Sequence, residues 1–399
     1  MNLSKDIKLL ITIGVLNSLI WIIFIGVVET NDSSSYYNAW TNLSNSTVDI
    51  YRTPSYPIFL GVLNLLFGSH YKFFAILFQH GLFLISSIYF YKSLAFFVNN
   101  DKIVLWSSIL YILCPALVYW NNAILTESLS ISGMCFLIYC FILLREKYNF
   151  CRYVFFFGWL LFLVMLRPSF LYLLLVFGAY WVIILVKRNY TKAVVGLCGI
   201  TILSGLFYLY ILSFQKEYGV LTPTCVSDIN RYVISRQYKL LEAQEISDQQ
   251  LRQDVSAYIN EERLTRAYSL WEETNSIFAK HDIKLIDEAL NASVHAKPFK
   301  YFLNIIVRFY KASGYVYVFY VLLFLYFIIL LSNAIMTKKI PTMSVILFSI
   351  GLLNLLVVLI GSLDCHGRLN ISVFSIYIIM IAQLVANINR ETIKKIEFV

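Results

Sequence analysis

The residues best suited to chemistry are a carboxylate and an arginine in one polar, tyrosine-rich loop, Asp32 and Arg52. Arg52 precedes a Thr-Pro-Ser-Tyr-Pro turn, and arginine binds phosphate oxygens through two N–H groups at once. A lipid phosphate at a membrane surface is the ligand that such an arginine would meet. Asp32 has two interpretations, the N-cap of a short interfacial helix or a member of a site. Tyr36, Tyr37 and Tyr56 are further site candidates, although aromatic residues also gather at membrane interfaces for packing alone.

The composition predicts a polytopic membrane protein made of helices. Of the 399 residues, 59% are hydrophobic and 14% are charged, and the mean hydropathy is +0.70. Several runs reach the ~20 apolar residues that cross a hydrocarbon core, and they are continuous rather than alternating, which excludes a β-barrel. The seven cysteines show no C-x-x-C spacing, so we interpret them as small core residues rather than a metal framework.

Ten apolar runs are expected to cross the membrane: 9–28, 71–92, 103–120, 124–144, 153–166, 170–186, 192–213, 313–334, 341–362 and 368–388. A further apolar piece, Tyr56–Gly68, rises only ~18 Å as a helix, which is too short to cross. Charge decides its placement. If it stays at the interface, fifteen Lys/Arg of the loops share a side with the N-terminus, against Arg52, Lys72, Arg167 and Arg368 on the other. Basic loops stay in the cytoplasm, so this arrangement, with both termini inside, is the one we expect.

This topology brings the charged residues beside apolar spans to one outer face: Asp32, Arg52, Glu127, Arg167, Asp364, His366 and Arg368. Such charges are costly near a membrane and are usually retained for function, so their convergence predicts a site. Glu127 could instead complement a helix dipole, and Arg167 could be a snorkelling residue in a hairpin turn. Asp364 and His366 could ligate a metal, but two ligands do not make a metal site.

Three parts are expected along the chain. They are an N-terminal membrane module, 1–213, whose first external loop is 29–70, an extracytoplasmic helical segment, 214–312, and a C-terminal membrane module, 313–399. The middle segment has 13 Lys/Arg and 13 Asp/Glu, which fits neither a nucleic-acid surface nor an acidic tail.

Within that segment the apolar spacing favours helices at 228–246, 248–280 and 282–296, followed by an amphipathic helix at 299–310 on the membrane surface. No Gly-rich phosphate loop, H-E-x-x-H or G-x-S-x-G motif occurs anywhere in the sequence. A site on the outer face would also lack cytosolic nucleotides, which indicates a lipid-borne activated substrate.

A series of short motifs resembles one enzyme family. Asp32-Ser-x-x-Tyr36 and Arg52-Thr-Pro-x-Tyr56-Pro resemble the first external loop of GT-C glycosyltransferases of the ArnT and protein-mannosyltransferase type. Further matches are Gln79, Pro115, Asn122-x-x-Leu-Thr-Glu127-Ser-Leu129, Leu166-Arg167-Pro-Ser169, Lys297-Pro-x-x-Tyr301 and Gly367-Arg368-Leu-Asn370. These motifs cover residues 1–190 and, more loosely, the C-terminus. The resemblance implies a GT-C-like bundle of about ten transmembrane helices.

The resemblance also implies an activity, which is transfer of a sugar from a polyprenyl-phosphate donor to a glycan, lipid or protein acceptor on the non-cytoplasmic face. The family's acidic position falls on Asp32, as the general base that deprotonates the acceptor hydroxyl. Its basic position falls on Arg52, which would hold the departing phosphate together with Arg167 and Arg368. Attack opposite the leaving group implies inversion at the anomeric carbon, by a hexosyl- or pentosyltransferase.

The sequence departs from the family at two positions. Ser33 stands where many relatives have a second acid, and Tyr51 stands where ArnT-like enzymes have an acid before the arginine. No cofactor is certain, and a divalent metal stays open. Two other functions stay open as well, a polysaccharide polymerase or ligase that uses a diphosphate-linked oligosaccharide, and a lipid or sugar flippase. We expect a bacterial inner membrane as the location, undecaprenyl phosphate as the carrier and a cell-envelope glycan as the product.

Overall fold

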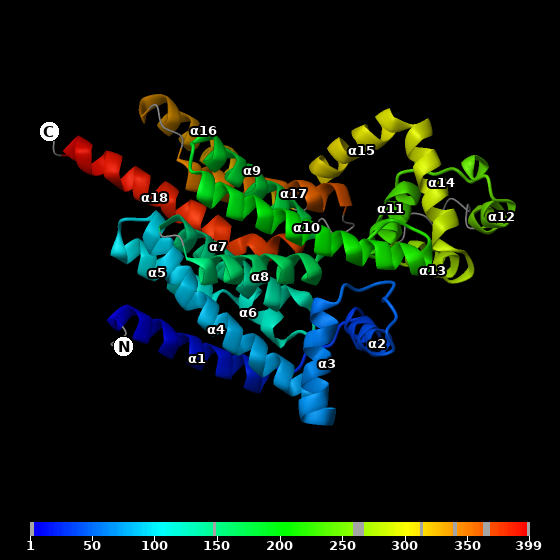
Figure 1. The fold of residues 1–399 in the computed structure, drawn as a ribbon, viewed down its shortest axis with the longest axis horizontal. Coiled ribbons are helices and arrows are strands. Elements are labelled where there is room, and N and C mark those ends of the chain that lie inside the picture. Colours follow the sequence, from blue (N-terminus) through cyan, green and yellow to red (C-terminus); the bar gives the residue numbers. More distant parts are fainter. Residues whose placement is uncertain are drawn as a thin grey trace.

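The protein is a bundle of membrane-spanning helices with a smaller helical segment at one end (Figure 1). The computed structural model describes residues 4–146, 149–257, 267–311, 314–337, 341–361 and 368–396. Within these ranges it is helical, and its one β-bridge joins Val28 to Ala123. Eight helical stretches there are long and apolar enough to cross a membrane, or nine if a bent pair forms one span. The expectation of a polytopic helical membrane protein is therefore confirmed.

The bundle helices follow the predicted runs closely: α1 Lys5–Phe24, α4 Tyr71–Phe97, α5 Asp101–Leu113, α6 Pro115–Asn122, α7 Thr126–Glu146, α8 Phe150–Leu166, α9 Tyr172–Val186, α10 Tyr190–Tyr218, α16 Gly314–Thr337, α17 Thr342–Gly361 and α18 Phe374–Ile396. Two differ from the expected ten spans. The run 103–120 is broken into α5 and α6, which meet at 42°, because Pro115 has no N–H to continue a helix. Helix α8 has 17 residues and is shorter than the candidate spans, among which α9 reaches 19 residues together with the 3₁₀ turn η2, Pro168–Leu171, that precedes it.

Helix α7 is the centre of the bundle. In its apolar stretch 83% of the residues are buried, against 11% in α1. The sequence allows this position because α7 carries small residues, among them Ser128, Ser132 and Gly133, that let neighbouring helices approach closely. A Cβ atom at Gly133 would lie 2.8 Å from the Leu163 side chain of α8. The first turn of this buried helix holds Glu127, so the fold carries a carboxylate into the core of the bundle.

Helix α3, Ser55–Phe67, does not continue into α4 as one long span. The Tyr56 hydroxyl donates to Gln79 Oε1 of α4 at 2.9 Å, although 23 residues separate them, which would place them about 34 Å apart in a continuous helix. The chain turns at Gly68, whose φ of +53° favours glycine. Figure 1 shows α3 lying across the end of the bundle, with Leu65 and Leu66 exposed. This is the geometry expected of an interfacial helix.

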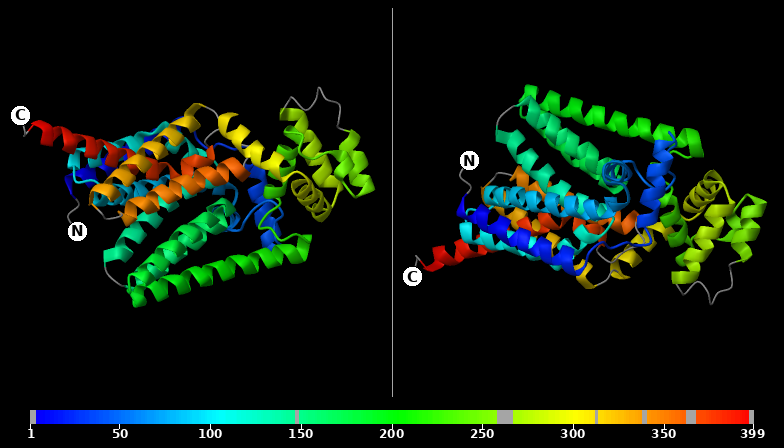
Figure 2. Two further views of the ribbon diagram at one scale, coloured as in Figure 1. Left: turned by 90° about the horizontal axis from the view of Figure 1, so that it is seen from above. Right: turned by 90° about the horizontal axis from the view of Figure 1, so that it is seen from below.

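The two ends of the bundle carry different elements. Both chain termini lie at one end, and α2, Ser33–Ser44, lies with α3 at the opposite, distal end (Figures 1 and 2). The helices that follow α10 also lie at the distal end: α11 Val226–Gln237, α12 Gln249–Ala257, α13 Ala267–Lys280, α14 Ile283–Ala296 and α15 Pro298–Lys311. The first loop and the polar segment, residues 214–312, therefore meet at one end, as the charge distribution predicted.

The polar segment has a hydrophobic core of its own. Tyr232, Leu251, Val255, Ile277 and Leu290 are buried together, one or more from each of α11 to α14. A helix was predicted over 228–246, and the observed helix α11 ends earlier, at Gln237. Of the helix predicted over 248–280, the structure describes residues 248–257 and 267–280. The predicted amphipathic helix is α15, where Phe299, Phe302, Leu303, Ile306 and Val307 are exposed.

Candidate functional site

Helix α2 and its N-cap residue hold Arg52, which lies in the following loop, by its whole guanidinium group. Its Nη2 donates to Asp32 Oδ1 at 2.9 Å, its Nε to Ser35 Oγ at 2.7 Å and its Nη1 to Tyr36 Oη at 3.2 Å. The guanidinium also lies over the Tyr36 ring, 4.3 Å from the centroid. The Arg52 side chain is 19% exposed and that of Asp32 is 42% exposed. The pair therefore forms at the surface of the distal end, where a ligand can reach it.

Asp32 occupies the N-cap position of α2 without capping the helix. Its side chain accepts no capping hydrogen bond and turns to Arg52 instead. The backbone on both sides of it is fixed, because Val28 pairs with Ala123 and the Ser33 hydroxyl donates to the Ile124 carbonyl at 3.1 Å. The carboxylate is thereby held in place by the chain that connects α6 to α7. Of the two interpretations of Asp32, the geometry favours the member of a site.

A buried tyrosine pair lies beneath Arg52. Tyr36 and Tyr56 meet edge to face with their ring centroids 4.9 Å apart. Gln79, which accepts from Tyr56, donates to the carbonyl oxygens of Asn121 and Ala123 at 2.9 Å each. These contacts connect α2, α3, α4 and the chain between α6 and α7 in one rigid unit. Arg52 therefore rests on a preorganised support.

A second ion pair lies next to the first. Arg167 Nη2 is 3.7 Å from Glu127 Oε1, and Arg167 Nη1 donates to Ser372 Oγ at 3.1 Å. Glu127 is fully buried and the Arg167 side chain is 13% exposed. Ser372 belongs to η5, Arg368–Val373, so this pair joins α7 and the α8–η2 turn to the C-terminal module.

The two ion pairs influence one another electrostatically. Burial acts to lower the pKa of Arg52, but Tyr36, Asp32 and Glu127 outweigh burial and raise it, so the guanidinium stays charged. Burial raises the pKa of Tyr36, on which Glu127 and Arg167 also act. The sequence prediction that Asp32, Arg52, Glu127 and Arg167 converge thus describes their positions in the structure, and Tyr36 and Tyr56 belong to the same cluster.

Asp49 is a site residue that sequence reasoning missed. It is buried, and its Oδ1 accepts the backbone N–H groups of Tyr51 at 2.9 Å and of Arg52 at 2.7 Å. Its Oδ2 accepts from the Asn42 side chain at 2.8 Å. The available signal was an Asp three residues before the arginine, a spacing at which aspartate side chains commonly bind backbone N–H groups in turns.

The other candidates are placed apart from this cluster or lie outside the described residues. Tyr37 faces a surface group, where its hydroxyl donates to Glu29 at 3.4 Å and its ring meets Tyr71. Lys72 pairs with Glu29 at 2.8 Å. Asp364 and His366 lie outside the described residues, and for Arg368 the description covers the backbone only. In the part of the chain that is described, no group of three or more His, Cys, Asp or Glu could hold a metal ion.

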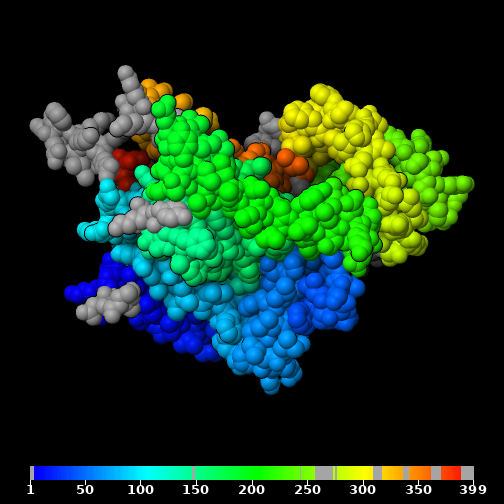
Figure 3. Space-filling model, viewed as in Figure 1, coloured from blue at the N-terminus to red at the C-terminus, as the bar shows by residue number. Residues whose placement is uncertain are grey.

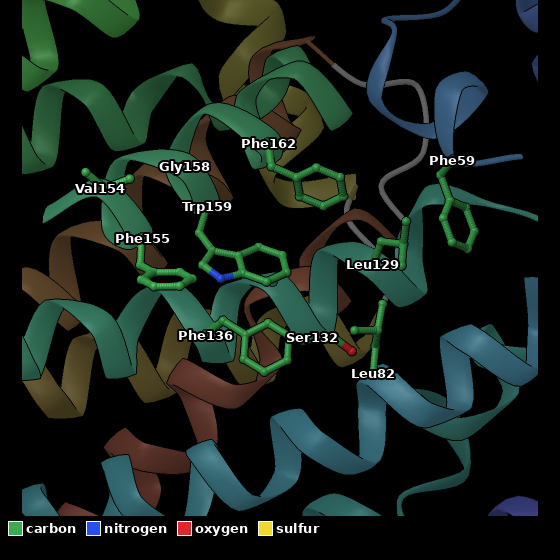
Figure 4. Close-up of a pocket in the computed structure, with 11 residues that line it drawn as sticks. Phe59, Leu82, Leu129, Ser132, Phe136, Val154, Phe155, Gly158, Trp159 and Phe162 are labelled. Carbon is green, nitrogen blue, oxygen red and sulfur yellow. The ribbon is translucent and has the colours of Figure 1, made fainter. Parts of the chain in front are cut away.

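An apolar groove begins beside the Arg52 loop. It has a volume of about 540 Å³ and is lined by residues of α3, α4, α7 and α8. Figure 4 shows Phe59 and Leu129 at one end and Val154 and Phe155 at the other, with Trp159 between them. The first end lies at the site, because Phe59 is one helical turn after Ser55 and Leu129 is two residues after Glu127. Among its lining residues only Ser132 has a polar side chain besides Trp159.

No known family model matches the chain, and no curated protein matches it. The function is therefore argued from the geometry of the site.

Proposed function

We propose that this integral membrane protein is an inverting glycosyltransferase that moves a sugar from a polyprenyl-phosphate donor to an acceptor hydroxyl on the non-cytoplasmic face. One observation carries the proposal: a surface carboxylate–arginine pair is connected through the rings of Tyr36 and Tyr56 to Phe59, which lines an apolar groove within the bundle. A ligand that matches both features has an anionic head and a long apolar tail. A polyprenyl phosphate has this chemistry, and the attached sugar would lie at the head, beside Asp32.

The groove supports a lipid substrate because of its lining. Phe59, Leu82, Phe136 and Trp159 offer apolar and aromatic surface, against which a lipid tail that arrives from the bilayer gains van der Waals contact. Helix α3 lies across the end of the bundle with exposed apolar residues, at the depth where a lipid head group would meet the protein. The groove thus presents the donor phosphate to Arg52 and keeps its tail in the bundle.

The reaction needs one base and one phosphate ligand. The acceptor hydroxyl gives its proton to the Asp32 carboxylate, and its oxygen attacks the anomeric carbon. The bond from that carbon to the phosphate oxygen breaks, and its electron pair leaves with the phosphate. Arg52 stabilises the developing negative charge with two or more N–H groups. Because the acceptor attacks opposite the phosphate, the anomeric configuration inverts.

The ion pair itself gives a first test. Asp32→Asn should lower the transfer rate by roughly 10²- to 10⁴-fold, since that is the usual contribution of a general base. The same change keeps an oxygen that can accept from Arg52 Nη2 but removes the negative charge beside it, so binding of the anionic polyprenyl phosphate should become tighter. Arg52→Gln should weaken that binding by about tenfold or more. The measurements are radiolabelled sugar transfer in detergent and direct binding of polyprenyl phosphate.

Glu29→Gln is the matched control, because Glu29 is a carboxylate of the same loop that pairs with Lys72 instead. Glu29→Gln should leave the rate of sugar transfer and the binding of polyprenyl phosphate unchanged. Full transfer by the Asp32→Asn protein would remove Asp32 as the base. Transfer only from a diphosphate-linked oligosaccharide would identify a polymerase, and movement of lipid across sealed vesicles without sugar transfer would identify a flippase.

A further inference from the structure

The backbone of the short segment Val48–Arg52 is hydrogen-bonded to the chain that leads into the polar segment. Val48 N–H donates to Glu217 Oε2 at 3.0 Å, and the Tyr218 hydroxyl donates to the Val48 carbonyl at 2.7 Å. Cys225 N–H donates to the Ile50 carbonyl at 2.9 Å. Figure 3 shows the surface of the first loop directly against the end of α10. Three of the polar groups along this backbone are therefore held by residues 217–225.

The residues that make these hydrogen bonds, Glu217, Tyr218 and Cys225, lie on either side of a defined turn. Helix α10 ends at Tyr218, and Gly219 follows with a φ of +75°, the left-handed conformation that ends a helix and favours glycine. The chain then reaches Cys225, the N-cap residue of α11. We call residues 217–225 the junction. The junction is continuous with the helices of the polar segment and contacts the first loop at the same time.

Asp49 connects the hydrogen-bonded backbone of Val48 and Ile50 to the site. It lies between the two hydrogen-bonded residues, Val48 and Ile50. Its buried carboxylate accepts hydrogen bonds from the backbone N–H groups of Tyr51 and Arg52. The side chain of Asn42 holds the other carboxylate oxygen. Arg52 is thus fixed twice, by α2 at its guanidinium and by Asp49 at its backbone. Movement of the junction would be passed to Arg52 over only a few bonds.

We propose that the junction positions Arg52 for the phosphate head group, with Asp49 as the positioning residue that connects them. The polar segment thereby controls how the site holds its donor. The inference rests on the proposed function for the identity of the ligand. Its mechanical part, the hold of the junction on the backbone of Arg52, stands on the hydrogen bonds alone.

The mechanical part is tested by hydrogen exchange of the full-length protein in nanodiscs, read on the peptide that contains Tyr51 and Arg52. Asp49→Ala should speed exchange of these two amides by about tenfold or more, because each loses its acceptor. Asp49→Asn should exchange like the wild type, since an amide oxygen can accept the same two bonds and Asn42 can turn its own oxygen toward the new NH₂. Tyr218→Phe, which removes one hydroxyl, should also speed exchange, and Tyr208→Phe on the exposed face of α10 should not.

Binding of undecaprenyl phosphate to the same proteins tests the functional part. Asp49→Ala and Tyr218→Phe should weaken it severalfold, and in a transfer assay they should raise the donor KM more than they lower kcat. Asp49→Asn should restore the wild-type value, which a metal-binding or acid–base role of the carboxylate would not allow. Faster exchange in Tyr218→Phe with unchanged lipid binding, in a protein that needs Arg52 to bind, would overturn the positioning role.

The two proposals fail in different ways. If Arg52→Gln binds undecaprenyl phosphate as well as the wild type does, the proposed function fails, and the exchange data still decide whether the junction holds Arg52. If exchange at Tyr51 and Arg52 is unchanged in Tyr218→Phe, the junction does not hold this backbone and the inference is wrong.

Discussion

Arg52 and Asp32 hold one another in an ion pair, and this contact has a consequence for the proposed reaction. A phosphate that binds Arg52 competes with the Asp32 carboxylate for the same N–H groups. Once the phosphate takes them, the carboxylate is released toward an acceptor hydroxyl, which gives a reason for the donor to bind first. Tyr36 and Ser35 keep Arg52 in place during this exchange of partners, because their bonds to it do not involve Asp32.

Asp228 gives a second prediction at the scale of a residue. Burial raises its pKa from the ordinary value of 3.8 to about 6, with Arg231 acting to lower it and Asp287 to raise it. Its Oδ2 is buried with no hydrogen-bond partner in the described structure. The folded state therefore binds this proton more tightly than the unfolded state does. Stability contributed by the protonated group is present below about pH 4 and is lost as the pH rises through about 6.

Asp228→Asn should remove this pH dependence. The shift of about two pKa units corresponds to on the order of 3 kcal/mol, so the variant should be more stable than the wild type at pH 8 and closely similar at pH 4. The measurement is the thermal unfolding midpoint of the full-length protein in detergent at the two pH values. A wild-type protein whose midpoint stays level from pH 4 to 8 would contradict the prediction.

The sequence predicted which charged residues converge but not how they pair. The count of basic loops was sufficient for Glu127 and Arg167, because few charges lie beside apolar runs. The two neighbours Tyr36 and Tyr37 show what was missing. Adjacent residues on a helix point about 100° apart, so both could not face Arg52, and only the path of α2 decides that Tyr36 does. Asp49 was missed for the same reason, since its role depends on the backbone of a loop.

At the scale of elements, the apolar groove can be filled by a single substitution. Gly158 of α8 lines it, and a Cβ atom there would have no heavy atom within 4 Å. Gly158→Leu should therefore fold normally, occupy the groove and lower transfer from a long polyprenyl donor by about tenfold or more, because the leucine side chain takes space in which the tail would pack. The measurement compares donor KM for long and short polyprenyl chains.

Gly205 provides the control for this experiment. It lies on α10, is exposed, does not line the groove, and also has no heavy atom within 4 Å of an added Cβ. Gly205→Leu changes helix propensity and lipid-facing surface in the same way, and donor use should not change. Equal loss in the two variants, or no loss in Gly158→Leu, would mean that the groove does not hold the donor tail.

Elements were more predictable than the site because their signal is local. A run of ~20 apolar residues is sufficient to predict a spanning helix, and the described bundle helices follow the expected runs. The exceptions have local causes that the runs do not record. Pro115 divides one run into α5 and α6, and α10 continues to Tyr218, beyond the expected end at 213, because helix formation does not stop where apolar residues end. The depth of α3 followed from charge, and its fold back onto α4 needed the structure.

At the scale of the whole molecule, the arrangement of the two ends makes the topology testable. The termini lie at one end and the site with the polar segment at the other (Figure 1), and the described basic turns between α4 and α5 and between α9 and α10 also lie at the end of the termini. Since basic loops stay in the cytoplasm, the distal end should face outward. The proposed function depends on this orientation, because a donor flipped to the outer leaflet would reach only an outward-facing site.

Single cysteines placed at the two ends of a cysteine-free variant should therefore label differently with a membrane-impermeant maleimide. Asn45→Cys follows α2 at the distal end, Asn99→Cys joins α4 to α5 at the end of the termini, and both positions are exposed. In intact cells the first should react and the second should not, while permeabilised cells should label both, which shows that each site is accessible in a folded protein. Labelling of Asn99→Cys alone would invert the topology and place Asp32 and Arg52 on the cytoplasmic side, where a nucleotide-linked donor would have to be considered in place of a polyprenyl phosphate.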